Sequence, residues 1–176
     1  ILKGKELSSN EIVDLACHIE IDILKEPIGI QDQCACSIGG LNVWNFRRTG
    51  KDTDIRYTSF DEQYPEFENH LLLFYTGQTR EAKTVLVEQK KNIPKRIEAL
   101  KAMVKMVDEF KDELINHKLS ILGKIINTSW LVKKNLSSNV SNSIIDKYLK
   151  QGLQAGAFGG KLLGAGGGGC LLFIAP

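Results

Sequence analysis

The sequence has no long apolar segment, little net charge and few cysteines, and each of these absences excludes a class of protein. No apolar run approaches the ~20 residues that a membrane-spanning helix requires. A formal net charge of +2, without a basic run, gives no electrostatic basis for binding nucleic acid. The chain starts at Ile1 without a signal-peptide pattern. We therefore expect a cytoplasmic protein that has neither a membrane nor nucleic acid as a partner.

The cysteines are too scattered to form a zinc site. Only Cys34 and Cys36 lie close together, and the single residue between them is too short a spacing for a zinc knuckle. Scattered cysteines in a chain of 176 residues are more typical of a reduced protein than of a disulfide-linked one. We therefore expect no metal ligands in this chain.

Glycine, in contrast, is concentrated in one place. Seven of the 16 glycines lie between Gly159 and Gly169. Residues without a Cβ atom adopt positive φ without a steric penalty, and their N–H groups can converge on an anion. Because a helical pattern precedes this stretch and the apolar run 170–175 follows it, we expect a helix-to-strand loop that contacts an anion. A plain connection without a ligand is the alternative.

Neither of two common nucleotide-binding motifs describes this glycine stretch. The Walker motif fails because Leu162 follows Gly160 and Lys161, where Ser or Thr is required. The dinucleotide pattern matches at Gly164, Gly166 and Gly169. That fingerprint, however, follows a strand and opens a helix, which is the reverse of the order expected here.

Two helices are predicted in the first part of the chain. The capping-box spacing of Ser8 and Glu11 and the apolar period behind it predict a helix over residues 9–25. A second, short helix should end at Gly39-Gly40. Asp32 would lie in its first turn, where the helix dipole and unpaired N–H groups favour an ionised carboxylate. A functional carboxylate and a simple capping residue are both consistent with this position.

Strand patterns follow. Residues 41–46 and 55–60 are expected to pair as a hairpin, and the continuous apolar run 70–75 predicts a strand buried on both faces. That run leads to Thr76-Gly77-Gln78-Thr79-Arg80, where Arg80 could clamp a phosphate or simply be a surface residue. From residue 81 the pattern is helical almost to the glycine stretch. The fold class is therefore α/β, of the mixed α+β kind.

Three separated motifs together resemble the GHMP small-molecule kinases. They are Gly-Ile-Gln-Asp-Gln at 29–33, Thr-Gly-Gln-Thr-Arg at 76–80 and the glycine stretch at 159–169. Within that family the chain is most similar to the D-glycero-D-manno-heptose 7-phosphate kinases. Further segments carry this similarity, namely 26–29, 39–42, 72–77 and Ser129-Trp130. Fucose and other anomeric sugar kinases share the three motifs.

The resemblance implies a two-lobe fold. Residues 1–80 would be the later part of the N-terminal lobe, and residues 81–176 an incomplete, ferredoxin-like C-terminal domain, with the boundary between 79 and 89. Family members are longer, and their N-terminal Gly/Ser phosphate loop and final helix and strand do not occur in this sequence. The chain is therefore expected to be a piece of a kinase and to be inactive by itself.

The resemblance also implies a reaction and a set of roles. The kinase would transfer the γ-phosphate of ATP to the anomeric hydroxyl of heptose 7-phosphate and give the 1,7-bisphosphate, with Mg²⁺ held mainly outside this sequence. Its partners would be ATP and the sugar phosphate, and it could form a homodimer.

The resemblance assigns roles to residues as well. Asp32 would be the catalytic residue. The substrate-binding residues would be Gln31, Gln33, Thr79 and Arg80, and the glycine motif would comprise Gly160, Lys161, Gly164, Ala165, Gly166, Gly167 and Gly168. Another anomeric sugar kinase, or a non-catalytic chain that binds a sugar phosphate, is the alternative.

Overall fold

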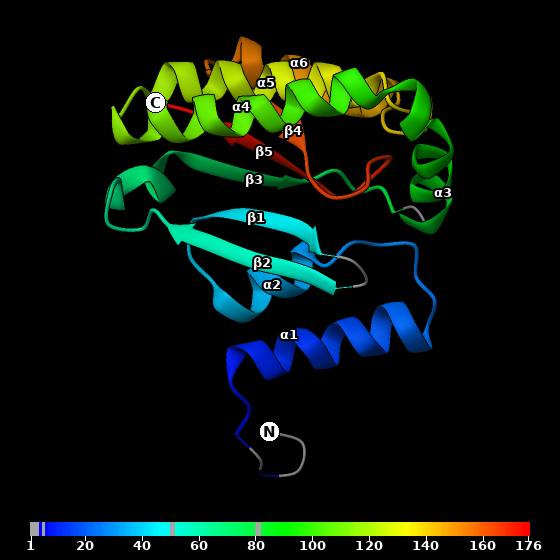
Figure 1. Cartoon of the computed structure of the whole chain (residues 1–176). Coiled ribbons are helices and arrows are strands. Elements are labelled where there is room, and N and C mark those ends of the chain that lie inside the picture. The colour runs from blue at the N-terminus through cyan, green and yellow to red at the C-terminus, as the bar shows by residue number, and fades with distance from the viewer. Residues whose placement is uncertain (1–3, 5, 50–51, 80–81) are drawn as a thin grey trace. The chain divides into compact units, whose positions relative to one another are not determined.

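A computed structural model describes residues 4, 6–49, 52–79 and 82–176 of the chain (Figure 1). Its contacts divide the chain into two compact units, Ile1–Glu62 and Gln63–Pro176.

The first unit begins with a helix that changes its winding. Helix α1 spans Ser9–Cys17, and its N-terminus has the predicted capping box between Ser8 and Glu11. The helix continues as a π-helical segment over His18–Ile23. The predicted helix over residues 9–25 is thus confirmed, with the addition of a π-helical winding that is often found at functional sites.

A short helix and a hairpin complete the first unit. Helix α2 spans Gln31–Ile38 and ends at Gly39, whose φ of 74° is the conformation that favours glycine. Strands β1 (Asn42–Thr49) and β2 (Asp52–Ser59) then pair antiparallel, with Trp44 opposite Tyr57. The predicted short helix and hairpin are confirmed, and each strand is longer than the sequence pattern indicated.

The second unit combines a small sheet with several helices. A 3₁₀ segment, Pro65–His70, leads into the first strand, and another, Ile93–Lys95, links two helices. The helices and strands, in chain order, are β3 (Leu71–Tyr75), α3 (Ala82–Asn92), α4 (Ile97–Ile115), α5 (Leu119–Lys134), α6 (Ser143–Gln154), β4 (Gly159–Leu162) and β5 (Cys170–Ile174).

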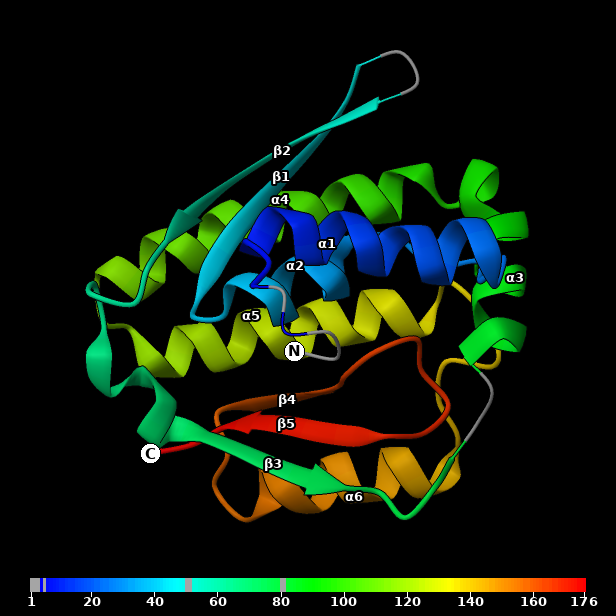
Figure 2. The same cartoon turned by 90° about the horizontal axis from the view of Figure 1, so that it is seen from below.

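The sheet of the second unit has the order β3-β5-β4, with both pairings antiparallel (Figure 2). Strand β3 is therefore an edge strand. Four of its five residues are exposed, from 44% for Leu72 to 62% for Tyr75. The expectation that this strand is buried on both faces is wrong for this chain, because a continuous apolar run does not distinguish a central strand from an edge strand.

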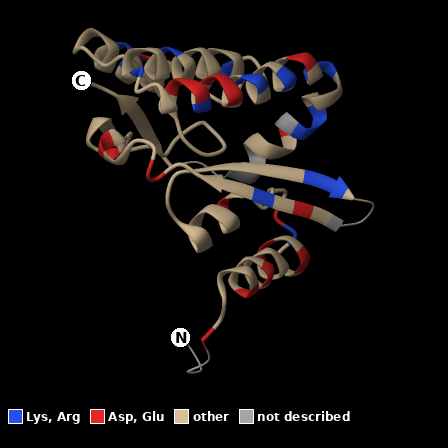
Figure 3. Cartoon of the chain, turned by 60° about the vertical axis from the view of Figure 1, so that its left-hand side comes forward, with Lys and Arg blue, Asp and Glu red and all other residues tan. Residues whose placement is uncertain are grey.

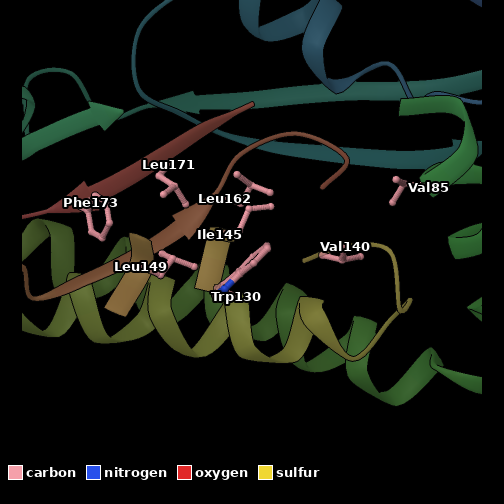
Figure 4. Close-up of a cluster of buried hydrophobic side chains, with 8 residues drawn as sticks. All are labelled: Val85, Trp130, Val140, Ile145, Leu149, Leu162, Leu171 and Phe173. Carbon is pink, nitrogen blue, oxygen red and sulfur yellow. The ribbon is translucent and has the colours of Figure 1, made fainter. Parts of the chain in front are cut away.

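The core of the second unit lies between the sheet and its helices (Figure 4). Trp130 of α5, Leu149 of α6 and Phe173 of β5 pack together there. The remaining members are Val85, Val140, Ile145, Leu162 and Leu171. Mixed α and β structure thus confirms the fold class.

The position of β3 also bears on the division of the chain. The contacts place the boundary after Glu62, earlier than the lobe boundary expected between residues 79 and 89, because β3 is hydrogen-bonded to β5. The lobe boundary of a full-length kinase stays a prediction. Among the described residues, no helix combines the length and hydrophobicity needed to cross a membrane.

Charged residues of both signs occur along the helices of the second unit (Figure 3). On α4, for example, Lys101 lies 2.8 Å from Glu98 and Lys111 lies 3.6 Å from Asp108. These pairs are one helical turn apart and exposed, so each contributes only a few tenths of a kcal/mol, roughly.

Candidate functional site

Asp32 lies at an open helix N-terminus. It is exposed in the first turn of α2, and the N-cap residue Ile30 offers no side-chain hydrogen bond to the helix. The N–H groups of such a first turn have no partner in the helix, and the helix dipole adds positive potential there. A carboxylate in this position is accessible to a small polar ligand. Gln31, next to it, is also exposed.

Gln33 differs from its two neighbours because it is buried. Only 5% of Gln33 is exposed, and its Nε2 donates a 2.6 Å hydrogen bond to Oε2 of Glu20 in the π-helical segment. Its Oε1 has no hydrogen-bond partner among the described residues. This contact ties α2 to the preceding helix immediately beside Asp32, an arrangement that favours a positioning role for Gln33. The predicted role of Gln33 in substrate binding stays a prediction.

The glycine stretch is a strand followed by a tight loop. Gly160 and Lys161 lie in β4, and residues 163–169 connect β4 to β5. The expected helix-to-strand loop over the whole stretch is therefore wrong, because its first residues pair with β5. Close packing explains the glycines here: a Cβ atom on Gly160 would lie 2.5 Å from Cδ1 of Phe173, and one on Gly159 would overlap the carbonyl group of Gly123.

The loop and the Thr76–Gln78 segment are hydrogen-bonded together. The N–H and the hydroxyl of Thr76 donate to the carbonyl oxygen of Gly169 at 2.9 and 2.8 Å. The N–H of Gly169 donates to the carbonyl oxygen of Gln78 at 3.0 Å. A Cβ atom on Gly168 would lie 2.7 Å from the same oxygen. Two of the three motifs that carried the family resemblance thus meet in space.

Val140 packs against the loop as well. Its carbonyl oxygen accepts a 2.8 Å hydrogen bond from the N–H of Gly167, and a Cβ atom on Gly166 would lie 2.9 Å from that oxygen. Gly164 is different, because it is exposed, has a φ of 68°, and has open space where a Cβ atom would stand. The side-chain amine of Lys133 donates to its carbonyl oxygen.

The N–H groups of the loop differ in whether they have a protein acceptor. Those of Leu163, Gly167 and Gly169 donate to Cys170, Val140 and Gln78. Within the described part of the chain, the N–H groups of Gly164, Gly166 and Gly168 have no protein acceptor. Successive N–H groups of this kind form anion-binding concavities in other proteins.

Lys161 projects from β4 just before the loop and is partly buried. Burial lowers the pKa of Lys161, because the charged ammonium loses hydration. It has no carboxylate partner among the residues that the structure describes. A partly dehydrated cation of this kind is suited to meet an anionic ligand.

The remaining predicted site residues are placed only in part. Thr79 is exposed after Gln78, and Arg80 lies outside the described residues. Asp32 and its neighbours belong to the first unit, whereas Thr79 and the glycine motif, including Ala165, belong to the second. Across the described ranges, no group of three or more His, Cys, Asp or Glu side chains could hold a metal ion.

Sequence reasoning missed the residues that support these sites. Glu20, Val140 and Asn142 carry no motif of their own. Asn142 caps α6 and also donates from Nδ2 to Oε1 of Gln78 at 2.8 Å. The capping role could have been predicted, because Asn142 directly precedes a helical pattern. No nearby residue indicates the hydrogen bond to Gln78.

Comparison with known proteins agrees with the three motifs. Residues 106–176 match the family "GHMP kinases C terminal". The D-glycero-alpha-D-manno-heptose 7-phosphate kinase of Campylobacter jejuni is 32% identical over 172 residues, which are 96% of this chain and 50% of that protein. The mevalonate kinase of Pyrococcus horikoshii is 31% identical over 184 residues, or 99% of this chain and 50% of that protein.

A solved structure shares the fold. The mevalonate kinase of L. major, crystallised with R-mevalonate, superposes with a TM-score of 0.69 at 18% identity, over 97% of this chain and 50% of that one. The chain therefore spans about half the length of the proteins it resembles.

Proposed function

Because this chain belongs to the GHMP kinase family, whose C-terminal domain it carries at residues 106–176, we propose that it is part of an ATP-dependent sugar kinase. The substrate we propose is D-glycero-D-manno-heptose 7-phosphate, phosphorylated on its anomeric hydroxyl to the 1,7-bisphosphate. The observation that carries this proposal is the 32% identity to a heptose 7-phosphate kinase across 96% of the chain. The three motifs named above lie within that similarity.

Asp32 is the proposed catalytic residue. Phosphoryl transfer passes through a loose transition state, so catalysis consists mainly of positioning and charge stabilisation. A carboxylate at the exposed N-terminus of α2 can accept a hydrogen bond from the sugar hydroxyl and orient it. It can then take the proton as the oxygen attacks phosphorus, a contribution of about 10²- to 10⁴-fold in rate. Gln31, Thr79 and Arg80 are proposed to contact the substrate.

The glycine loop is the proposed anion-binding element. Within the described residues, the N–H groups of Gly164, Gly166 and Gly168 are donors without protein acceptors, and Lys161, in β4 just before the loop, adds a positive charge. ATP would supply the transferred phosphoryl group and leave as ADP, and Mg²⁺ would neutralise the charge that develops on that group. We propose, as the family resemblance implies, that the main Mg²⁺ ligands lie in the part of the kinase outside this chain. We accordingly expect the 176 residues alone to be inactive.

The wider setting belongs to the same proposal. Residues 1–80 would complete the N-terminal lobe of the kinase, and residues 81–176 would form its C-terminal domain. We place the enzyme in the cytoplasm, with ATP and a sugar phosphate as its partners, and it could form a homodimer.

Mevalonate phosphorylation is the second candidate. It is favoured by the 31% identity to a mevalonate kinase over 99% of the chain, almost the same identity as to the heptose kinase. The two substrates differ in charge and shape, because only the heptose carries a phosphate before the reaction.

A substrate screen with the full-length kinase decides between them. ATP consumption is measured with heptose 7-phosphate, mevalonate, fucose and galactose, and product identity is checked by mass spectrometry. We expect turnover with heptose 7-phosphate at a kcat/KM at least about 100-fold above that for the others, since a site built to pair a charged group discriminates strongly. Preferential turnover of mevalonate or of a free sugar would replace the proposed substrate. Binding of heptose 7-phosphate without turnover would favour the non-catalytic alternative.

A further inference from the structure

The carboxylate of Glu88, on α3, gathers the hydrogen-bond donors of residues 136–140, which we call the 136–140 segment. The hydroxyl of Ser138 donates to Oε1 of Glu88 at 3.2 Å, and Nδ2 of Asn139 donates to Oε2. The hydroxyl of Ser137 contributes most to holding the pKa of Glu88 below its usual value, and Asn139 and Ser138 add to it against the effect of partial burial. The carboxylate is therefore ionised and satisfied by this segment at neutral pH.

A second side chain of the same helix holds the start of the segment. Asn92, one turn after Glu88, donates from Nδ2 to the carbonyl oxygen of Leu136 at 3.0 Å. Leu136 and Ser137 are both buried. Two polar side chains of α3, Glu88 and Asn92, thus hold the segment by hydrogen bonds.

The last residue of the segment, Val140, packs against the glycine loop. Val140 is completely buried and belongs to the same core cluster as Val85 of α3 (Figure 4). Its carbonyl oxygen accepts the N–H of Gly167 at 2.8 Å, and its backbone fills the space beside Gly166. A shift of the 136–140 segment would therefore move the acceptor that holds the loop.

We propose that Glu88 is a positioning residue, which sets the conformation of the glycine loop through the 136–140 segment. A carboxylate suits this role because several donors converge on it and it presents only acceptors. Glutamine in its place would direct one amide donor at Ser138 or Asn139. The effect on the loop follows from the hydrogen bonds alone, whereas the effect on catalysis rests on the kinase function proposed above.

The first test measures the loop directly, by amide hydrogen exchange in the 176-residue chain followed by NMR. Glu88→Ala should speed exchange of the Gly167 amide about tenfold or more, the change expected when hydrogen bonds to a charged group are lost. Amides within the β5 strand should change little, and Glu88→Gln should give an intermediate effect. Glu109→Ala, which removes an exposed carboxylate from α4, is the matched control and should leave Gly167 unchanged.

Two results would overturn the proposal. One is an unchanged exchange rate at Gly167 in Glu88→Ala. The other is an equal acceleration of all amides in the second unit, which would mean that Glu88 stabilises the whole unit rather than the loop. If Glu88→Ala does not fold, Ser138→Ala removes a single hydrogen bond from an exposed residue, and it should speed exchange at Gly167 by a smaller factor. No acceleration in Ser138→Ala would then decide against the proposal.

The second test uses the full-length kinase. Glu88→Ala should lower kcat/KM by about tenfold, while Glu88→Gln should recover part of the loss and Glu109→Ala should match the wild type. Unchanged kinetics in Glu88→Ala, together with faster exchange at Gly167, would separate the loop conformation from catalysis and remove the catalytic part of the proposal. A wild-type enzyme without turnover of any tested substrate would instead be a failure of the proposed function, and the exchange measurement would still stand.

Discussion

The hydroxyl of Thr76 donates a 2.8 Å hydrogen bond to the carbonyl oxygen of Gly169, 93 residues later in the chain. The backbone N–H of Thr76 donates to the same oxygen, at 2.9 Å. Both Thr76 groups thus hold the end of the glycine loop where β5 begins. Thr76 is only 6% exposed, so water does not compete freely for this contact.

Thr76→Val should weaken this junction without changing its shape. Valine keeps the volume and branching of threonine but loses the hydroxyl that donates to Gly169 and accepts from the N–H of Gln78. We expect a loss of about 1 kcal/mol in the free energy of unfolding, measured by urea denaturation. Thr76→Ser, which keeps the hydroxyl, should lose less. Equal stability of Thr76→Val and the wild type would show that the side-chain hydrogen bond contributes nothing.

Two glycines of the loop should differ sharply in their tolerance of alanine. Gly164 has positive φ but open space around it, so Gly164→Ala should cost only the backbone term of roughly 1–2 kcal/mol. Gly166 has a φ of 113°, and a Cβ atom there would also lie 2.9 Å from the Cα atom of Val140. Gly166→Ala should therefore cost more than about 3 kcal/mol.

Urea denaturation of the two variants side by side measures this difference. Similar losses in both would mean that the backbone of Val140 moves away readily, and the loop would then be softer than its contacts indicate. The comparison also separates packing from ligand approach, because, of these two glycines, only Gly164 has open space where a Cβ atom would stand. A Gly164→Ala kinase that is stable but poorly active would point to the anion at that position.

Local signals explain what the sequence could predict. The capping box at Ser8 and the stop at Gly39 are short-range features, so α1 and α2 were predictable, and with them the position of Asp32 in a first turn. The hairpin of β1 and β2 was predictable for the same reason, although strand lengths depend on cross-strand partners.

Contacts between distant residues explain what the sequence could not predict. The glycine stretch contains a strand because Gly159 and Gly160 fit against Gly123 and Phe173, and nothing near these glycines in the chain indicates it. The hydrogen bond between Glu20 and Gln33 spans 13 residues, and Glu20 lies in a π-helical segment, which has no simple sequence pattern. The exposure of β3 depends on its place at the edge of the sheet, which an apolar run does not reveal.

Lys161→Met should separate stability from activity. The pKa of Lys161 is lowered by burial, so the charged form is disfavoured in the folded chain and the charge costs stability at neutral pH. Methionine removes this cost at similar length, and the urea midpoint should stay the same or rise. In the full-length kinase, however, kcat/KM should fall about tenfold or more if Lys161 meets a phosphate.

The control for this variant is Lys124→Met, because Lys124 is exposed on α5 and should affect neither quantity. A Lys161→Met enzyme with full activity would remove Lys161 from the proposed anion site. A lower urea midpoint would show instead that the ammonium makes a stabilising contact.

The stability contributed by Asp61 should depend on pH. Its pKa is lowered first by the N–H of Leu41, which donates to Oδ1 at 2.6 Å, and then by the hydroxyl of Ser59. A lowered folded pKa means that the stabilisation is fully present above the unfolded value, about 3.9. It is lost as the pH falls through the lower folded value.

Asp61→Asn should accordingly be less stable than the wild type at pH 7, and the difference should shrink as the pH falls below about 4. Urea midpoints of both proteins across that range provide the measurement. A difference that stays constant with pH would mean that the ionised carboxylate is not the stabilising form.

Asp32→Asn is the most direct test of the catalytic assignment. Asparagine keeps the size of the side chain but cannot accept a proton, so kcat in the full-length kinase should fall by about 10²- to 10⁴-fold. Because Asp32 is exposed, the variant should lose only the interaction of its charge with the dipole of α2, about 0.3–1 kcal/mol. Nucleotide binding, measured by calorimetry, should be almost unchanged.

Asp108→Asn, an equally conservative change on the exposed face of α4, is the control and should retain full activity. An Asp32→Asn enzyme with wild-type turnover would leave the exposed carboxylate of α2 with a capping role alone, and the search for the base would then turn to the part of the kinase outside this chain.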